Sequence, residues 1–162
     1  MLDEIAALRR AYDWARKSPD PSNQNGAVVV SDDGYQFGGG CNTFPPGTVP
    51  TSEQLQDRDW KLSHIEHAER YALYDTASHW STSGLILVCP WFACDACARA
   101  ILLCGIKRVV GHQQRMDTTP ERWKASVDAG LNILRRGGVE LTFISHVFGD
   151  EPILANGQLW VP

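Results

Sequence analysis

Apolar positions near the start of the chain recur at helical spacing, at Leu2, Ile5, Ala6, Leu8, Tyr12 and Ala15. They predict a first helix, which Pro19 and Pro21 bring to an end. A β-branched run then covers Gly26–Val30, and polar turn residues separate it from a second extended stretch at 35–41. These two stretches predict an antiparallel hairpin.

Downstream of the hairpin, helical and strand-like patterns alternate. We expect helices at 66–77, 95–104 and 121–136, and short buried strands at 85–88, 107–110 and 139–143. Such alternation is typical of layered α/β proteins. It predicts a single domain, 1–162, built as a three-layer α/β/α sandwich around a central mixed five-stranded sheet.

Two segments do not fit this alternation. Residues 42–63 are rich in Pro, Gly, Thr and charge, which predicts a long connecting loop. Its candidate buried anchors are Phe44, Leu55, Trp60 and Leu62. Such a loop can close over a reactive centre or contact a neighbouring subunit. The tail, 145–162, has no regular pattern, and no element is predicted for it.

The bulk composition narrows the classes of function. The chain has no apolar run of membrane-spanning length and starts with an amphipathic, charged segment, so we expect no membrane span and no secretory signal. The net charge of -4 argues against duplex nucleic acid as a partner, because such binding needs many Lys and Arg side chains. In a chain expected to be cytoplasmic, the five cysteines favour metal binding or burial over disulfides.

Two of these cysteines have the spacing of metal ligands. Cys94 and Cys97 lie three residues apart at the predicted start of a helix, so both sulfurs can face one ion. The positive end of the helix favours the thiolate, which is the form that binds metal. His67, at the start of another predicted helix, can supply a third ligand. Three protein ligands leave one tetrahedral position to water, as in a catalytic zinc site.

Glu69 is the candidate proton carrier, because it follows His67 closely and need not bind the metal. Zinc lowers the pKa of a bound water from about 15.7 towards roughly 7, which makes a nucleophile available near neutral pH. Residues two apart on a helix point in different directions. His67 and Glu69 can therefore share a site only if the helix begins there.

Each pattern alone has a simpler interpretation, either as two buried thiols or as a chance pair on a solvated helix. Together they match the deaminase signature of His-x-Glu followed by Cys-x-x-Cys. Four stretches then occur in order: DPSNQNGAVVV, GCNTFPPG, IEHAERYAL and ACDACARAILLCGIKRVV. In this order they resemble the deoxycytidylate (dCMP) deaminase family of the cytidine deaminase superfamily, from about Ala11 to Phe143.

The resemblance implies a cytidine deaminase-like fold, a Zn²⁺ cofactor and hydrolysis of dCMP to dUMP and ammonia. Glu69 would carry protons from the zinc water to N3 and to the leaving group. The resemblance also places Asn42 on the ribose or base, with a turn role as the alternative. Further candidates for substrate contact are Ser22 and Asn25, near the phosphate or sugar, and Trp91 and Phe92, which would either stack on the base or pack in the core.

The sequence departs from the family pattern at two places. Ala93 stands where the family usually has Pro, and Gln24 and Asn25 stand where it often has Lys and an apolar residue. A modified dCMP, another nucleotide, a nucleoside or a free base therefore stay open as substrates. A tRNA adenosine deaminase would need a basic surface, against which the net charge argues. A non-catalytic zinc module would close the fourth position with another Cys or His, and Glu69 argues against it.

The resemblance also carries expectations about partners. It implies a small-molecule nucleotide substrate, with dCTP and dTTP as candidate effectors. It further implies a homo-oligomer, either dimer-based or hexameric.

Overall fold

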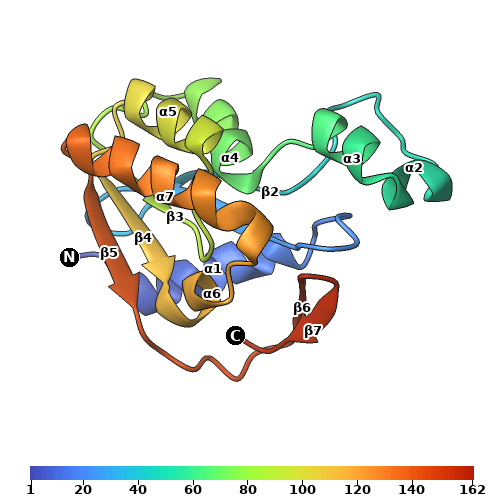
Figure 1. Cartoon of the computed structure of the whole chain (residues 1–162). Helices are drawn as coiled ribbons and strands as arrows, with labels where there is room; N and C mark the ends of the chain where they lie inside the picture. Colours follow the sequence, from blue (N-terminus) through green and yellow to red (C-terminus); the bar gives the residue numbers. More distant parts are fainter.

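The computed structural model describes residues 1–162, and its centre is a mixed sheet with the strand order β2-β1-β3-β4-β5 (Figure 1). The strands span Gly26–Val30 (β1), Gln36–Cys41 (β2), Ile86–Val88 (β3), Arg108–His112 (β4) and Glu140–Ile144 (β5). β1 is antiparallel to both β2 and β3, whereas β3, β4 and β5 are parallel. The predicted class, an α/β fold with a mixed five-stranded sheet, is confirmed.

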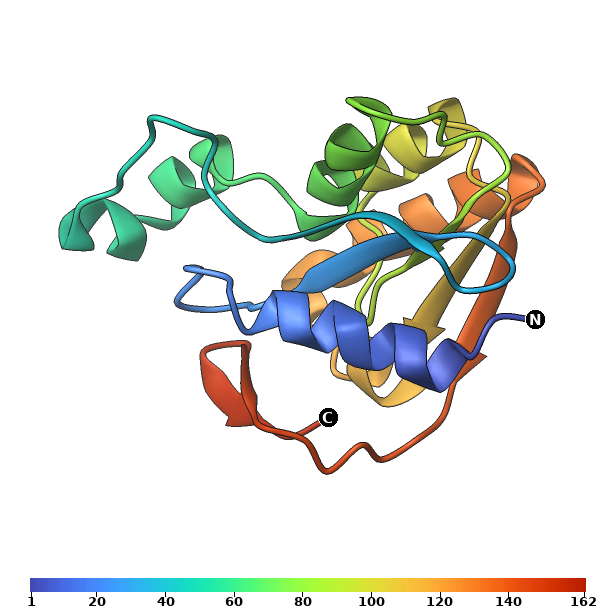
Figure 2. The same cartoon turned by 180° about the vertical axis from the view of Figure 1, so that it is seen from behind.

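Helices cover both faces of this sheet (Figures 1 and 2). One face carries α4 (Ala68–Ala77), α5 (Asp95–Leu103) and α7 (Glu121–Arg136), and the other carries α1 (Glu4–Ala15). Two apolar clusters fill the layers, one centred on residues such as Leu73 and Ile101 and the other on residues such as Leu8 and Val28. β1 is buried along its whole length, which explains why its sequence is continuously apolar rather than alternating.

The segment between β2 and α4 differs from the predicted loop. It contains two short helices, α2 (Ser52–Gln56) and α3 (Arg58–His64), which extend as an arm beyond the sheet (Figures 1 and 2). Of the expected anchors, Phe44 is buried and its ring lies 5.9 Å from that of Trp60. The one buried residue of α3 is Lys61, and α2 buries none. The loop prediction was therefore wrong for α2 and α3.

The tail also has regular structure where none was predicted. After β5, the chain passes along the α1 side of the sheet and forms a two-stranded hairpin, β6 (Ile153–Ala155) and β7 (Gln158–Trp160). Asn156 and Gly157 make its turn with φ of 55° and 77°. Asn-Gly suits a two-residue turn in which both residues need positive φ.

The predicted helices and strands are otherwise present, with small shifts at their ends. The helix at 121–136 has the predicted bounds, and a short helix that was not predicted, α6 (Gln113–Asp117), follows β4. None of the helices has both the length and the apolar character needed to cross a membrane.

Candidate metal centre and pocket

The candidate ligands stand at the beginnings of two helices. His67 is the N-cap of α4, with extended backbone at φ -79° and ψ 148°. Cys94 is the N-cap of α5, and its sulfur accepts a hydrogen bond from the Cys97 amide at 3.5 Å. Because α4 begins directly after His67, this residue and Glu69 both line one pocket. The requirement that the helix should start there is met.

Two other side chains hold the backbone at the start of α4, and the imidazole of His67 takes no part in capping. His67 makes no side-chain capping bond. Instead, the Ala68 amide donates to Asn42 Oδ1 at 3.0 Å, and the His67 amide donates to Glu66 Oε1 at 2.9 Å. This division of roles leaves the ring of His67 free to face the two cysteines.

The geometry of the three ligand atoms fits a tetrahedral zinc ion. His67 Nδ1 lies 3.5 Å from both Cys94 Sγ and Cys97 Sγ. An ion with Zn–N of about 2.0–2.1 Å and Zn–S of about 2.3 Å would hold such a pair of atoms about 3.5 Å apart. All three ligand atoms lie within 4.8 Å of one another, and no other His, Cys, Asp or Glu side chain joins the group.

The two thiols do not ionise equally by themselves. Hydrogen bonds with Cys97 and His67 lower the pKa of Cys94 to about 4, against the opposing effect of burial. The hydrogen bond with Cys94, together with burial, raises the pKa of Cys97 well above its ordinary value. A bound divalent cation would ionise both thiols, because a coordinating thiol loses its proton.

Glu69 lies beside this group and is 3 % exposed. Burial raises the pKa of its carboxyl group to about 7, although the charge of His67 acts in the opposite direction. Burial alone would lower the pKa of His67, but the hydrogen bond with Cys94 and the charge of Glu69 raise it. Proton transfer near neutral pH is favoured when a carboxyl group is tuned in this way.

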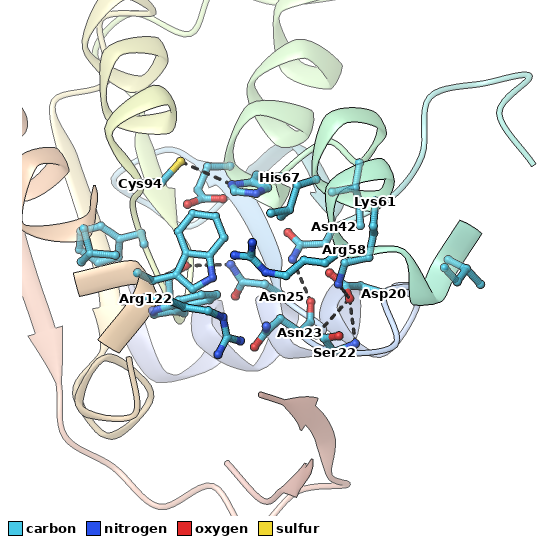
Figure 3. Close-up of a pocket in the computed structure, with 18 of the residues that line it drawn as sticks. Asp20, Ser22, Asn23, Asn25, Asn42, Arg58, Lys61, His67, Cys94 and Arg122 are labelled. Atoms are coloured by element: carbon cyan, nitrogen blue, oxygen red, sulfur yellow. Dashed lines mark hydrogen bonds and ion pairs between the residues drawn. The ribbon is translucent and has the colours of Figure 1, made fainter. Parts of the chain in front are cut away.

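The pocket beside the metal group has a volume of about 300 Å³ and is drawn in Figure 3. Every candidate residue for substrate contact lines it: Ser22, Asn25, Asn42, Trp91 and Phe92. The structure therefore brings the catalytic, metal and substrate candidates together, apart from Cys97, which lies behind Cys94 at the first turn of α5.

For some of the candidates for substrate contact, other protein groups already occupy the hydrogen-bonding atoms or the ring. Asn25 Nδ2 donates to the Trp91 carbonyl oxygen at 2.8 Å, and the amide of Asn42 bridges Asn23 and Ala68. Both residues therefore also shape the pocket wall. Phe92 is 1 % exposed and stacks on Phe143 with ring centroids 5.5 Å apart, which makes core packing its main contact.

Several pocket residues carried no clear signal in the sequence. Arg58 and Arg122 come from α3 and α7, on two sides of the pocket in Figure 3, and Trp123 packs edge-on against the His67 ring at 5.9 Å. Lys61 forms a buried ion pair with Asp20 at 2.8 Å. A long polar loop near the site was a hint of Arg58 and Lys61, but the partner of Lys61, Asp20, lies far away in the chain.

Asp20 is the best-connected of these residues. Its Oδ1 accepts hydrogen bonds from Lys61 Nζ and from the backbone amides of Ser22 and Asn23, at 2.8, 2.8 and 3.2 Å. One carboxylate thus shapes the loop that lines the pocket and anchors α3 to it. The carboxylate of Asp20 already neutralises Lys61, so the unpaired cations at the rim are Arg58 and Arg122, neither of which takes part in an ion pair.

Comparisons with known proteins agree with this site. The family model for the cytidine and deoxycytidylate deaminase zinc-binding region matches residues 1–113. Deoxycytidylate deaminase of Mus musculus is 32% identical over 105 residues, covering 62% of this chain and 58% of that protein. The Homo sapiens protein is 31% identical with the same coverage. The chain thus spans less than two thirds of the length of these curated relatives. The zinc-binding family and the His/Cys/Cys group confirm the expected zinc cofactor.

Solved structures support the fold. The dCMP deaminase from the cyanophage S-TIM5, in complex with dCMP and dUMP, matches with a TM-score of 0.70 and 24% identity. The match covers 89% of this chain and 99% of that one. The same phage enzyme in its apo form matches with a TM-score of 0.67. At this level of identity, the comparison speaks for the architecture.

Proposed function

This chain belongs to the cytidine and deoxycytidylate deaminase family, and from that premise we propose that it hydrolyses a pyrimidine deoxynucleotide, dCMP, to dUMP and ammonia. One observation carries the proposal. His67, Cys94 and Cys97 form a three-ligand group with zinc spacing, and Glu69 shares the pocket beside it. Two relatives named deoxycytidylate deaminase support dCMP as the substrate.

In this proposal, His67 Nδ1 and the sulfurs of Cys94 and Cys97 hold the metal. Zinc bound there would acidify a water molecule and so supply the nucleophile. Glu69 takes up the two protons of the water in turn, and it delivers one to N3 of cytosine and the other to the departing 4-amino group. Water adds its oxygen at C4, the C4–N bond breaks, and ammonia leaves.

The shape and charge of the pocket support a phosphorylated substrate. Arg58 and Arg122 are exposed at the rim and make no ion pair, whereas Glu69 lies at depth beside the ligands. A guanidinium group matches phosphate with paired hydrogen bonds. We propose that the base lies against Trp91 near the metal group, and that the phosphate lies towards the two arginines. Ser22, Asn25 and Asn42 line the space between them.

The experiment is a substrate panel with ammonia release as the readout. It uses zinc-loaded protein with dCMP, CMP, dCTP, deoxycytidine, guanine and adenosine. We expect dCMP to be turned over with the highest kcat/KM. Preference for deoxycytidine or guanine would instead indicate a nucleoside or base deaminase. Absence of ammonia from every compound, with zinc bound, would refute the proposal.

We also propose that the chain forms a homo-oligomer that responds to dCTP or dTTP. α2 buries no residue within its own chain, and its arm extends beyond the sheet, which leaves it free to contact a neighbour or to close over the pocket. Sedimentation with and without dCMP, dCTP and dTTP tests the assembly, and a strictly monomeric active enzyme would contradict it.

All five cysteines are free thiols, which supports a reducing cytoplasmic compartment.

A further inference from the structure

A fully buried arginine lies behind the pocket and has no carboxylate partner. Arg115, on α6, is 0 % exposed and belongs to none of the ion pairs of the molecule. Its guanidinium carbon lies 4.6 Å from the ring centroid of Trp91 and 6.0 Å from that of Trp160. Burying a guanidinium group without an opposite charge is costly. Its buried Nε has no hydrogen-bond partner, so the partners of Nη1 and Nη2 indicate what holds the group in place.

One of those partners, Asn23, is a wall residue of the pocket, and the other, Thr118, follows the same helix. Nη2 of Arg115 donates to Asn23 Oδ1 at 3.1 Å, and Nη1 donates to Thr118 Oγ1 at 2.7 Å. Asn23 lines the pocket, and so does Trp91, whose ring faces the guanidinium. Arg115 itself does not line the pocket. It contacts two wall residues from behind and touches no substrate.

The C-terminal hairpin reaches the same wall. The Asn156 amide, at the hairpin turn, donates to Asn23 Oδ1 at 2.9 Å, so this oxygen accepts from both Asn156 and Arg115. Further bonds connect the hairpin to the pocket loop: Gly157 amide to Ser22 carbonyl, Gln24 amide to Leu154 carbonyl, and Leu154 amide to Gln24 Oε1, each at 2.8 Å. The hairpin therefore holds the backbone of residues 22–24 as a neighbouring strand would.

From Asn23 the connections continue to the helix that carries the catalytic candidates. The Asn23 carbonyl accepts from Asn42 Nδ2 at 2.8 Å, and Asn42 Oδ1 accepts from the Ala68 amide at 3.0 Å. Ala68 lies between His67 and Glu69 in sequence. Three hydrogen bonds in sequence thus connect Arg115 with the first residue of α4.

We propose that Arg115 and the C-terminal hairpin (153–160) are positioning elements for substrate binding, acting through Asn23 on the pocket wall and on the start of α4. The substrate in this inference rests on the proposed function. Asn23 is the point where the buried cation, the hairpin turn and the pocket meet. Loss of Arg115 frees Asn23 to turn its side chain, and the wall at 22–25 and the contact with Asn42 loosen together. Misplacing a binding wall in this way weakens substrate affinity without removing a metal ligand.

The test uses zinc-loaded full-length protein and the variants Arg115→Met, Arg115→Lys and Arg10→Met. Arg10 is the matched control, because it too has a buried Nε without a partner and forms no ion pair, and it donates to the Gly34 carbonyl at 3.1 Å, but it lies outside the pocket. Five quantities are measured well below the melting temperature, which is determined separately: zinc content, kcat for dCMP, KM for dCMP, the dissociation constant of dUMP by calorimetry, and amide hydrogen exchange over 20–26 and 66–70.

We expect Arg115→Met to keep its zinc and to raise both KM for dCMP and the dissociation constant of dUMP by about tenfold, with a smaller change in kcat. Exchange should accelerate over both segments. Arg115→Lys keeps a cation against Trp91 and one donor for Asn23, so it should fall between Arg115→Met and wild type. Arg10→Met should lower the melting temperature with no change in KM or in exchange over these segments. Unchanged KM, dUMP affinity and exchange in Arg115→Met would overturn the inference.

If Arg115→Met does not fold, Arg115→Lys and Asn23→Ala decide the question. Alanine removes the Oδ1 atom that accepts from Arg115 and from the Asn156 amide, and it keeps the backbone carbonyl that accepts from Asn42. Faster exchange and weaker dUMP binding in both variants would support the inference, and wild-type values in both would overturn it. If wild-type protein neither deaminates dCMP nor binds dUMP, the proposed function fails, and exchange over 20–26 and 66–70 still decides whether Arg115 positions the wall.

Discussion

His67 makes no side-chain capping bond, so its imidazole is available to a metal. Asn42 accepts from the Ala68 amide and Glu66 accepts from the His67 amide, which holds the start of α4 in place, while the imidazole lies beside the cysteines. The extended backbone of His67 then places it and Glu69 on one pocket, although regular helix geometry would separate them. At the scale of residues, the site depends on where one helix begins.

The first prediction concerns the metal ligands. Cys94→Ser replaces a sulfur that lies 3.5 Å from His67 Nδ1. We expect zinc affinity to fall by more than about 100-fold, because losing even an outer partner of a ligand costs about 10- to 100-fold. Competition with a chelator, followed by metal analysis, measures it. Cys104→Ser is the matched control, since Cys104 lies outside the ligand group. This variant should keep its zinc. Equal zinc retention in the two variants would contradict the assignment.

The second prediction separates proton transfer from metal binding. Glu69→Gln keeps the size of the side chain and removes the carboxylate, which is outside the ligand group. Zinc content and melting temperature should stay near wild type, while kcat for dCMP falls by about 10² to 10⁴-fold, the usual contribution of a positioned proton carrier. Glu121→Gln, on the exposed start of α7, is the control and should retain full turnover. Near-normal kcat in zinc-loaded Glu69→Gln would remove this residue from the role.

At the scale of elements, α7 packs directly on the loop that carries Cys94. A Cβ atom at Gly130 would lie 2.1 Å from the Ala93 carbonyl oxygen and 3.1 Å from the carbonyl carbon of Cys94. The obstacle is backbone, which cannot turn away as a flexible side chain can. The glycine therefore allows the helix to support the first cysteine at close range.

The third prediction follows from this contact. In Gly130→Ala, α7 and the loop at 93–94 must move apart. Overpacking costs about 1–3 kcal/mol in well-packed cores, and each kcal/mol lowers Tm by about 2–4 °C in a protein of this size. We also expect weaker zinc retention, because the Cys94 backbone shifts. Thermal melts with and without chelator measure both effects. Asn132→Ala, at an exposed position of the same helix, should change neither.

Sequence patterns are sufficient to predict some of the helices and strands but not others. The helix at 121–136 has four turns of amphipathic pattern and charged ends, and it forms at the predicted bounds. α2 and α3 are too short for such a pattern. Their signals are local ones, such as the capping box between Thr51 and Gln54. The hairpin at 153–160 had a signal as well, the Asn-Gly turn between short apolar runs, which the prediction missed.

The residues of the site likewise fall into those that sequence patterns predict and those that they do not. His67, Glu69 and the two cysteines are predictable because their chemistry requires those residue types at fixed local spacing. The pocket wall is not predictable by these means. Lys61 is buried only because Asp20 pairs with it across 41 residues of sequence, and Asn23 meets Asn156 across 133. No periodic pattern within a short stretch of sequence indicates partners that lie so far apart in the chain.

At the scale of the whole molecule, the tail closes the α1 side of the sheet over a buried histidine. His112, at the end of β4, is 0 % exposed. Its Nε2 lies 2.8 Å from the His146 carbonyl oxygen, to which it donates, so Nδ1 of the neutral ring accepts from the Tyr12 hydroxyl at 2.6 Å. Burial raises the pKa of Tyr12, which keeps that donor protonated. One histidine thus joins α1, β4 and the tail in a single neutral network.

The fourth prediction is the pH dependence of this network. Burial lowers the pKa of His112 below its ordinary value of 6.5, against the opposing effect of the His146 carbonyl, and no carboxylate faces the ring. The groups around it are Tyr12, the buried guanidinium of Arg115, the side chains of Gln114 and His146, and the rings of Phe148 and Trp160. As pH falls below about 6.5, the unfolded chain takes up this proton before the folded one does. The contribution of neutral His112 to the free energy of unfolding is therefore complete above that pH and decreases as the pH falls towards 5, whereas the raised pKa values of Glu69 and His67 act in the opposite direction over the same range.

Urea unfolding at a series of pH values measures this decrease, and His79→Gln, at an exposed position, should leave the slope unchanged. His112→Gln should be less stable at neutral pH, since glutamine cannot rebuild both bonds in the ring's place, but its difference in stability from wild type should shrink between pH 6.5 and 5. A constant difference would show that other groups carry the dependence. A shrinking difference would tie part of the acid sensitivity of the molecule to the point where the tail closes on the sheet, beside the hairpin that holds the pocket wall.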